Sequence, residues 1–425
     1  MNEAMISVEE ARARILDAIS RLPPETKPLE DALGQVLAED VSSPLTIPPR
    51  DNTSMDGYAV RAADTEDSSQ ASPRELRVIG EVAAGYTYDG ELQPGSAVRI
   101  MTGAPIPAGA DAVVPFEETD EEPGRAFGAF AKGRDHVGVF KTARPGANVR
   151  RAGEDVQAGS LVLSAGAQLG AAQLGVLASV GKRTVSVYRR PIVAVLSTGD
   201  ELLGLDQPYE HGKIYDSNAA SIAALISEAG GIPLRLGIAR DTVEDLTAKL
   251  RHGLGADLLV TSAGVSRGDY DVVKDVLERE GEVDFWTVRM RPGKPLAFGA
   301  FPAPDGRRVP HIGLPGNPVS SMVTFELFGR AAIFKLMGKT SWERQTLRVT
   351  VEDRVVNDDG RRFLARAIVR QRDGRYFASL TGSQSSGVLT SMALANALVV
   401  CPEDVPALES GQEADAIMLG PVTND

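Results

Sequence analysis

The chain has 425 residues, of which 43% are hydrophobic and 24% are charged, a composition typical of soluble globular proteins with several domains. Its net charge of −13 excludes the overall positive surface that drives non-specific nucleic-acid binding. A single cysteine, Cys401, excludes an intramolecular disulfide and a thiolate-clustered zinc site, and the four histidines show no metal-ligand spacing.

The N-terminal segment predicts a helix and no signal peptide. Met1-Asn2-Glu3-Ala4 carries no basic region ahead of an apolar one. Ser7 and Glu10 fit a capping box, and apolar residues then recur at helical spacing, which predicts an amphipathic helix over residues 7–22. The uncharged stretch Val156–Gly181 is rich in glycine, serine and glutamine and would insert poorly into a membrane. We therefore expect a cytoplasmic protein with no membrane or nucleic-acid partner.

Residues 45–150 predict a β-rich unit. The chain has 43 glycines and 26 prolines, more than average usage, which indicates many tight turns. In this region short apolar runs stand between glycine, proline and aspartate turns, as expected of strands. The runs are Leu76–Val82, Ser96–Met101, Ala112–Pro115 and Gly138–Phe140.

Residues 190–338 predict an open α/β domain with a largely parallel sheet. Pro191–Ser197 and Asp257–Ser262 are almost continuously apolar, as expected of strands covered on both faces. A helix opens between them at Ser217-Asn218, and strand and helix patterns alternate from there on. Further helices are expected at Thr242–Gly253, Val272–Glu280 and Pro318–Met337, and further strands at Leu234–Ala239, Val283–Met290 and Leu296–Phe301.

Residues 343–421 return to a β pattern. Leu347–Val351 alternates apolar and polar side chains. The turn sequences at residues 357–360 and 372–374 are both hairpin signals. We expect a small barrel or sandwich here.

Three polar or glycine-rich loops each follow an apolar strand of the α/β domain, at Thr198–Glu201, Ala263–Asp271 and Leu314–Pro318. Ligands of open α/β sheets bind at the carboxyl ends of the strands. The last loop also opens a helix, whose free amides favour an anion. Each loop alone is more often a turn with a helix cap, but three at one sheet edge favour a ligand site.

Carboxylates gather in these loops and after the Leu234–Ala239 strand, which ends at the same edge of the sheet. They would repel one another unless a cation bridges them, and a hard divalent ion such as Mg²⁺ suits carboxylate oxygens. The alternative for Asp241 and Asp271 is that each caps the helix that follows it. The residues concerned are Asp200, Glu201, Asp241, Asp269 and Asp271.

Further polar clusters stand outside these loops. Arg291 or Lys294, in a rigid basic turn, is placed to contact phosphate, unless the turn is merely solvated. In the β-rich unit, Asp51–Tyr58, Met101–Pro105 and Arg150–Asp155 are either site loops or turns with a surface ion-pair cluster.

At these residues the sequence resembles the molybdopterin molybdenumtransferase family, the MoeA-type molybdenum insertases that include the C-terminal domain of gephyrin. The resemblance extends over essentially the whole chain. The matching blocks, in chain order, are Asp51–Val60, Arg99–Pro107, Arg150–Asp155, Ser197–Leu202, Ile214–Asn218, Gly264–Lys274, Pro292–Pro295 and Gly313–Pro318.

The resemblance implies four domains. An elongated discontinuous domain takes residues 1–50 and 146–188, and a β-rich domain of residues 51–145 is inserted into it. The α/β molybdopterin-binding domain takes residues 189–340, and a C-terminal β-barrel takes residues 341–425. The family is dimeric, with each site shared between the α/β domain of one subunit and the inserted domain of the other.

The activity that the resemblance implies is the last step of molybdenum cofactor synthesis. The enzyme, a transferase, binds adenylylated molybdopterin and molybdate, cleaves the adenylate with Mg²⁺ and inserts molybdenum into the dithiolene. The implied catalytic residues are Asp56, Thr102, Glu201, Asp241 and Asp271, of which the last three hold the metal. The implied substrate-binding residues are Asp155, Ser266, Arg291, Lys294, Pro315, Gly316, Asn317, Pro318, Arg366 and Ser386.

The resemblance also implies partners and leaves alternatives. Expected partners are a second copy of the chain, the upstream adenylyltransferase and molybdoenzymes. The alternatives are a molybdopterin adenylyltransferase and a non-catalytic dimeric scaffold of the same fold. The chain departs from the family at Ala263, where a second glycine is usual, and at Arg267, where a small apolar residue is common. The barrel motif Gly382–Ser386 matches loosely.

Overall fold

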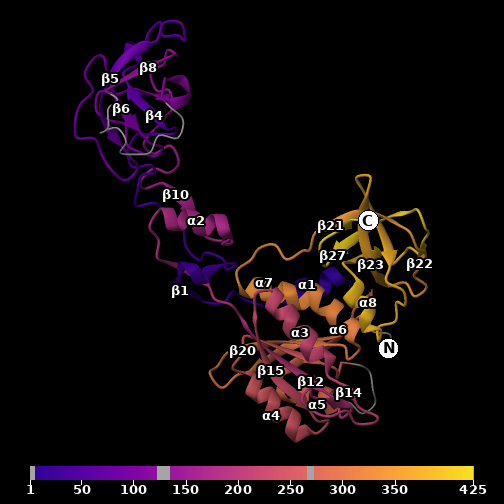
Figure 1. The fold of residues 1–425 in the computed structure, drawn as a ribbon. Helices are drawn as coiled ribbons and strands as arrows, with labels where there is room; N and C mark the ends of the chain where they lie inside the picture. The colour runs from indigo at the N-terminus through magenta and orange to yellow at the C-terminus, as the bar shows by residue number, and fades with distance from the viewer. Residues whose placement is uncertain (1–4, 122–134, 266–271, 425) are drawn as a thin grey trace. The chain divides into compact units, whose positions relative to one another are not determined.

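The computed structural model describes residues 5–121, 135–265 and 272–424 (Figure 1). They fold into two compact units. The first unit takes residues 1–39, 166–170 and 184–425, and the second takes residues 40–165 and 171–183. The finer division into four domains stays a prediction.

The α/β sheet of the first unit has the strand order β15-β12-β16-β20-β19-β17. From β15 to β20 the neighbouring strands run parallel, whereas β19 and β17 complete one edge in antiparallel pairing. The predicted open, largely parallel sheet is therefore confirmed, with an antiparallel edge. The strands are β12 (Ile192–Thr198), β15 (Ile232–Ala239), β16 (Leu258–Ser262), β17 (Glu282–Thr287), β19 (Pro295–Pro302) and β20 (Arg308–Leu314).

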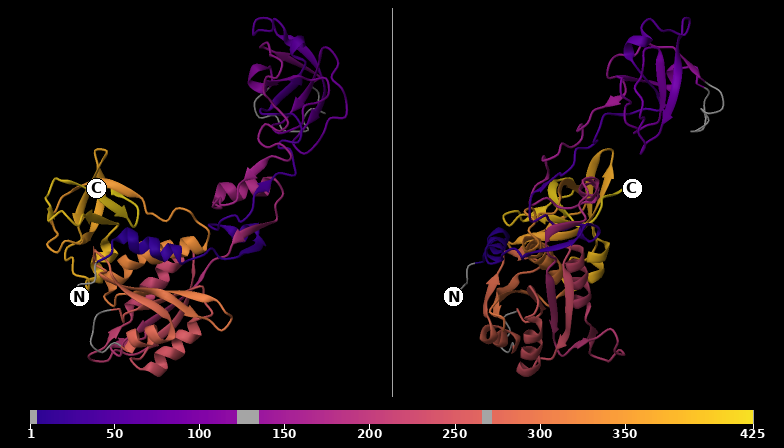
Figure 2. Two further views of the ribbon diagram at one scale, coloured as in Figure 1. Left: turned by 180° about the vertical axis from the view of Figure 1, so that it is seen from behind. Right: turned by 90° about the vertical axis from the view of Figure 1, so that its left-hand side faces the viewer.

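Helices cover both faces of this sheet (Figures 1 and 2). Val193 and Val195 of β12 pack with the helices of one face, and Ala194 and Leu196 pack with those of the other. Two buried faces explain why β12 has no polar alternation. One face carries α3 (Ser217–Glu228), α6 (Pro318–Thr324) and α7 (Arg330–Leu336), and the other carries α4 (Val243–Gly253) and α5 (Val272–Glu280).

Helix α1 (Val8–Asp17) begins as predicted and ends five residues earlier. The Ser7 hydroxyl accepts a hydrogen bond from the Glu10 amide at 3.0 Å, which confirms the cap. The second half of the capping box is wrong, because the Glu10 carboxylate pairs with Arg14 one turn further on. The chain after α1 leaves the helix to reach β1 (Pro24–Pro28), which pairs with β11 (Thr184–Tyr188).

Two further elements differ from their predictions. The predicted helix over 318–337 is interrupted by a π-helical turn, η5 (Phe325–Gly329), where the Phe325 ring packs in the space that a β-carbon on Gly329 would occupy. The predicted strand Val283–Met290 is two strands. The chain leaves the sheet after β17, and β18 (Met290–Arg291) pairs with a strand of the C-terminal region.

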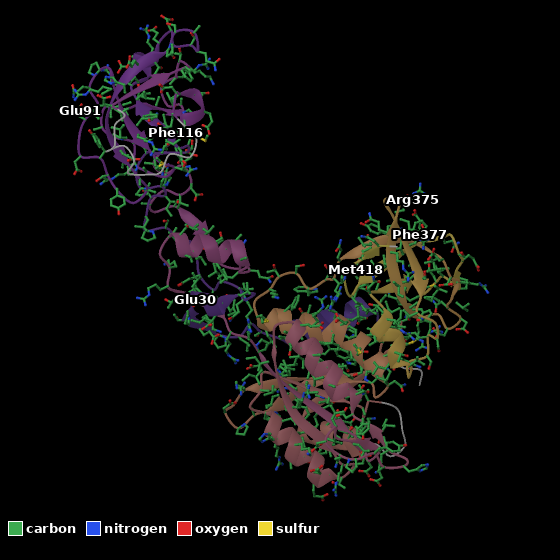
Figure 3. The ribbon with its side chains drawn as sticks, in the orientation of Figure 1. Glu30, Glu91, Phe116, Arg375, Phe377 and Met418 are labelled. Carbon is green, nitrogen blue, oxygen red and sulfur yellow. The ribbon has the colours of Figure 1, made fainter. Side chains whose placement is uncertain are left out.

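The C-terminal region closes into a barrel in the order β23-β24-β21-β27-β25 and back to β23, which confirms the predicted barrel. The turn at residues 372–374 is the predicted hairpin, with Arg372 opposite Arg375 and positive φ at Asp373 and Gly374. Figure 3 labels Arg375 and Phe377 on the second strand of this hairpin. The other predicted hairpin is wrong, because β22 (Val355–Val356) pairs with β26 (Ala407–Leu408). The remaining elements are β21 (Thr346–Val351), β23 (Arg362–Arg372), β24 (Arg375–Leu380), α8 (Leu389–Leu394), β25 (Ala397–Cys401), β27 (Glu413–Met418) and β28 (Thr423–Asn424).

The second unit contains the predicted β-rich sheet, with the strand order β7-β4-β6-β5-β8. Beside it, β2 (Val41–Ser42) pairs with β10 (Leu161–Leu163), and helix α2 (Ala171–Ser179) follows. No helix within the described residues is long and apolar enough to cross a membrane. The other strands are β3 (Asn52–Thr53), β4 (Gly57–Val60), β5 (Arg74–Val82), β6 (Ser96–Ile100), β7 (Ala112–Pro115), β8 (His136–Val139) and β9 (Val149–Arg150).

Candidate functional site

A cavity of about 1210 Å³ lies within the first unit. Its sheet-side wall comes from the loops after β12, β16 and β20, including Glu201, Ala263 and Pro315. Its other wall comes from the barrel, at Gln384–Gly387. All three predicted loops therefore contribute to one cavity, at the carboxyl ends of parallel strands.

The Pro315–Pro318 loop lines the cavity with all four of its residues. Pro318 is the first residue of α6, and the amide of Val319 donates to the Ser386 carbonyl at 3.2 Å. A carbonyl of the barrel loop therefore already accepts a hydrogen bond from one of the amides at the start of α6. The amides of Gly316 and Asn317 have no acceptor within the described residues, so the predicted anion contact narrows to these two groups.

The cations at the cavity differ in how they are engaged. The Arg291 guanidinium donates to Asp358 at 3.1 Å and to Asp359 at 3.4 Å, and it lies 3.9 Å from the ring centroid of Phe363. Lys294 is exposed, lines the cavity and forms no ion pair with any described residue. Lys294 is therefore the cation best placed to meet an anion, whereas two carboxylates already offset the charge of Arg291.

Arg366 lies completely buried behind the barrel wall. Its Nη2 donates to the carbonyls of Ser383, at 3.3 Å, and Ser385, at 3.0 Å, and its Nε donates to Ser391 at 3.2 Å. Within the described residues its Nη1 has no hydrogen-bond partner. Burial, and then repulsion from Arg291, lower the pKa of Arg366 to about 10, so it stays charged at neutral pH. It holds the Ser386 loop and places a positive charge behind it.

The carboxylates sit at neighbouring strand ends. Glu201, after β12, lines the cavity. The amides of Asp200 and Asp241 each donate to the other's carboxylate at 3.3 Å. Asp241 is not the cap of α4, because the Thr242 hydroxyl accepts from the Asp245 amide and the helix begins one residue later than that interpretation requires.

The described part of the chain contains no group of three potential metal ligands. Asp269, Asp271, Ser266 and Arg267 lie outside the described residues, so the predicted metal set is described only at Glu201 and Asp241. The structure brings these two to the ends of adjacent parallel strands, and their donor atoms are the carboxylate oxygens that Mg²⁺ prefers. The donor chemistry of the two residues fits the ion.

Two predicted catalytic residues meet in the second unit. One carboxylate oxygen of Asp56 accepts from the Thr102 amide at 2.6 Å and from the Thr102 hydroxyl at 2.7 Å. These hydrogen bonds, the amide's first, lower the pKa of Asp56. Asp155 is exposed in a turn. Arg151 forms an ion pair with Asp51, at 2.6 Å, so the charge of Arg151 is met from the Asp51–Tyr58 loop and not from within Arg150–Asp155 as predicted.

Ala263 stands where the family resemblance leads us to expect a second glycine, and its backbone conformation shows why glycine is usual there. Its φ of 85° lies in the left-handed region that favours glycine, and it is followed by Gly264 with φ 75°. A β-carbon on Gly264 would lie 2.2 Å from Val273, so only glycine fits there. Ala263 instead keeps its methyl group beside the cavity in a conformation that costs roughly 1 kcal/mol.

Sequence reasoning missed Asn218 as a site residue and placed it only at a helix start. In the structure it lines the cavity and bonds to two of the loops. The available signal for Asn218 was its position. It is an amide side chain in the first turn of a helix, near the carboxyl edge of a parallel sheet.

Three family models match the chain. They are the MoeA N-terminal region (domain I and II) over residues 6–181, the probable molybdopterin binding domain over residues 194–335 and the MoeA C-terminal region (domain IV) over residues 348–419.

Curated relatives and solved structures agree with these matches. The molybdopterin molybdenumtransferase of Nostoc sp. is 40% identical over 392 residues, which cover 91% of this chain and 87% of that protein. The Bacillus subtilis protein of the same name is 36% identical, with 97% of this chain and 94% of that protein covered. The crystal structure of a molybdopterin biosynthesis MoeA protein from Pyrococcus horikoshii OT3 is 28% identical, with a TM-score of 0.79 and coverage of 98% of this chain and 100% of that one.

Proposed function

The chain belongs to the MoeA family of molybdopterin molybdenumtransferases, and from this premise we propose that it inserts molybdenum into molybdopterin. Its substrates are adenylylated molybdopterin and molybdate. The matches to both terminal MoeA regions favour this activity over an adenylyltransferase or a scaffold.

One observation carries the proposal: the cavity combines hydrogen-bond donors and a positive charge that no described residue engages. Burying a small dianion such as molybdate requires fixed donors or a cation. Lys294 supplies a cation, the Gly316 and Asn317 amides supply donors, and Arg366 adds charge behind the barrel wall. A volume of about 1210 Å³ is ample for a nucleotide-sized substrate as well.

The residues of the cavity divide the work. Lys294 and the Pro315–Pro318 loop bind and orient the oxyanion, and the barrel loop with Ser386 closes the opposite side. Glu201, Asp241 and Asp271 would hold Mg²⁺, which would offset the charge that develops on the phosphate as the adenylate is cleaved. Arg291 connects the 291–295 turn, which lines the cavity, to the C-terminal barrel region through its hydrogen bonds to Asp358 and Asp359.

A cytoplasmic homodimer is part of the proposal. Asp56, Thr102 and Asp155 belong to the second unit, and we propose that they act in the site of a partner subunit. Mixing an Asp56→Ala subunit with an Asp271→Ala subunit would then restore one working site per heterodimer. Persistent inactivity of a verified heterodimer would contradict a shared site.

The test of the activity is reconstitution. The purified chain, adenylylated molybdopterin, Mg²⁺ and molybdate are combined with a molybdoenzyme that lacks its cofactor. We expect molybdate-dependent activation and release of AMP, both lost on chelation of the divalent ion. Release of AMP without any activation of the molybdoenzyme would reduce the function to hydrolysis and overturn the insertase.

A further inference from the structure

Asn218 joins three elements at the floor of the cavity. It is the second residue of α3, whose first turn is capped by Asp216 through the Ala219 amide at 3.0 Å. Its Nδ2 donates one hydrogen bond to the Ser262 hydroxyl at the end of β16, and another to the Gly316 carbonyl in the loop after β20. Both distances are 2.7 Å.

The orientation of the Asn218 amide is set by chemistry. A carbonyl oxygen can only accept, so the group that faces Gly316 must be the NH₂ and not the side-chain oxygen. The side-chain oxygen is buried and has no partner within the described residues. Ser262, at the end of β16, is 2% exposed, so the hydrogen bond to its hydroxyl anchors the NH₂ group to the sheet.

The bond to Gly316 sets the direction of a donor. The Gly316 carbonyl and the Asn317 amide belong to one planar peptide group, and in a trans peptide they point in opposite directions. Holding the carbonyl against Asn218 therefore fixes the direction of the Asn317 N–H. Because Gly316 has no β-carbon, rotation of this peptide meets little steric resistance, and a tether is needed to fix it.

We propose that Asn218 is a positioning residue that presents the Asn317 amide to the oxyanion substrate. This inference rests on the proposed function of the cavity. Asn218 acts through the loop and without direct participation in the chemistry. Its loss frees the 316–317 peptide to rotate, so the substrate meets a donor that is no longer fixed.

The test compares molybdate dependence across variants. Asn218→Leu removes the donor, keeps a similar shape and adds no charge that would itself repel molybdate. We expect the molybdate concentration for half-maximal cofactor formation to rise about tenfold, the order expected for losing one fixed donor to an anion. High molybdate should restore most of the rate. Asn218→Ala provides a second variant if the leucine does not fold.

One control separates positioning from stability. Asn396→Ala removes an amide that also bridges two carbonyls, those of Val369 and Pro421, both at 2.9 Å, in the barrel. It should lower the Tm and leave molybdate dependence unchanged.

A second readout is independent of catalysis. Without substrate, the NMR order parameter of the Asn317 N–H bond should be lower in Asn218→Leu than in the wild type, and unchanged in Asn396→Ala. If the wild type makes cofactor and Asn218→Leu shows wild-type molybdate dependence, the positioning role is overturned. If the wild type itself neither binds molybdate nor makes cofactor, the proposed function fails, and the order parameter of the Asn317 N–H bond alone then decides whether Asn218 fixes the loop.

Discussion

The two walls of the cavity are held in place by different means. The sheet-side wall consists of short loops that each leave a buried parallel strand, and these loops are joined to one another, as by Asn218 between Ser262 and Gly316. The barrel wall is a single loop bound from behind by one buried cation, Arg366, through the carbonyls of Ser383 and Ser385.

This difference predicts unequal tolerance to substitution. The sheet-side wall spreads its support over several strands, so losing one bond leaves the others in place. The barrel wall is held chiefly by the Arg366 side chain, and Gln384 adds bonds to the backbone of Arg366, at 2.8 and 3.1 Å, and to the Gly382 carbonyl, at 3.2 Å. Damage to Arg366 should therefore exceed damage at any single position of the sheet side.

The largest effect is expected from Arg366→Met. The change leaves the Ser383 and Ser385 carbonyls and the Ser391 hydroxyl without their donor, at a cost of about 3 kcal/mol in the free energy of unfolding. Activity should fall with it. Arg366→Lys should not restore either property, because one ammonium cannot reproduce the planar fork of a guanidinium. Thermal denaturation and reconstitution measure both.

A result that would contradict this comparison is a larger loss of stability in Ser262→Ala than in Arg366→Met. The two residues are both buried, at 2% and 0% exposure, so burial alone does not predict the order.

The next effect concerns two of the cations that line the cavity, Lys294 and Arg291. Lys294→Ala should raise the half-maximal molybdate concentration about tenfold, since it removes a charge that no described residue pairs with and disturbs little structure. Arg291→Ala should act mainly on stability, because Arg291 is bound to Asp358, Asp359 and Phe363. Titrating molybdate against cofactor yield separates the two. No recovery of the Lys294 variant at high molybdate would remove Lys294 from the site.

The same contrast between walls explains what the sequence could predict. Apolar runs such as Pro191–Ser197, each followed by a polar loop, predicted the sheet edge, because the carboxyl ends of parallel strands meet there. The barrel wall depends on contacts between Arg366 and residues 17 to 25 positions away, which no local pattern encodes. Its membership of the site was expected only from family resemblance.

Local errors have the same physical origin. The Asn357–Gly360 turn carries a hairpin signal, yet β22 pairs with β26, because the barrel's strand order overrides the local preference. Asp241 and Thr242 are adjacent and both are good caps, and only the backbone geometry shows that Thr242 is the one used.

A smaller effect tests the hydrogen bonds between Asp56 and Thr102 in the second unit. Hydrogen bonds from Thr102 lower the pKa of Asp56, so the stability they supply is present above the ordinary aspartate pKa and is lost as pH falls through the lowered value. Thr102→Val removes the hydroxyl and keeps the amide. The pKa of Asp56 should then rise part of the way to its ordinary value, as measured by NMR titration of the carboxyl carbon.

Asp51 is the internal control for that titration. Its pKa is lowered by the Ala152 amide and by Arg151, which Thr102→Val does not touch. A change in the pKa of Asp51 as large as that of Asp56 would show a general change in the unit. It would contradict a local effect of the Thr102 hydroxyl on Asp56.

The smallest effect is expected at Ala263, on the sheet-side wall. Ala263→Gly relieves a left-handed φ of 85°, and the added freedom of glycine in the unfolded chain offsets part of that gain. The net change in the free energy of unfolding should be a stabilisation between zero and about 1 kcal/mol, whereas glycine replacing alanine elsewhere usually destabilises. Ala178→Gly, within helix α2, is the matched control and should destabilise. Denaturant unfolding of both variants decides the sign, and a destabilised Ala263→Gly would mean that the surrounding loop, and not the backbone preference of residue 263, sets this conformation.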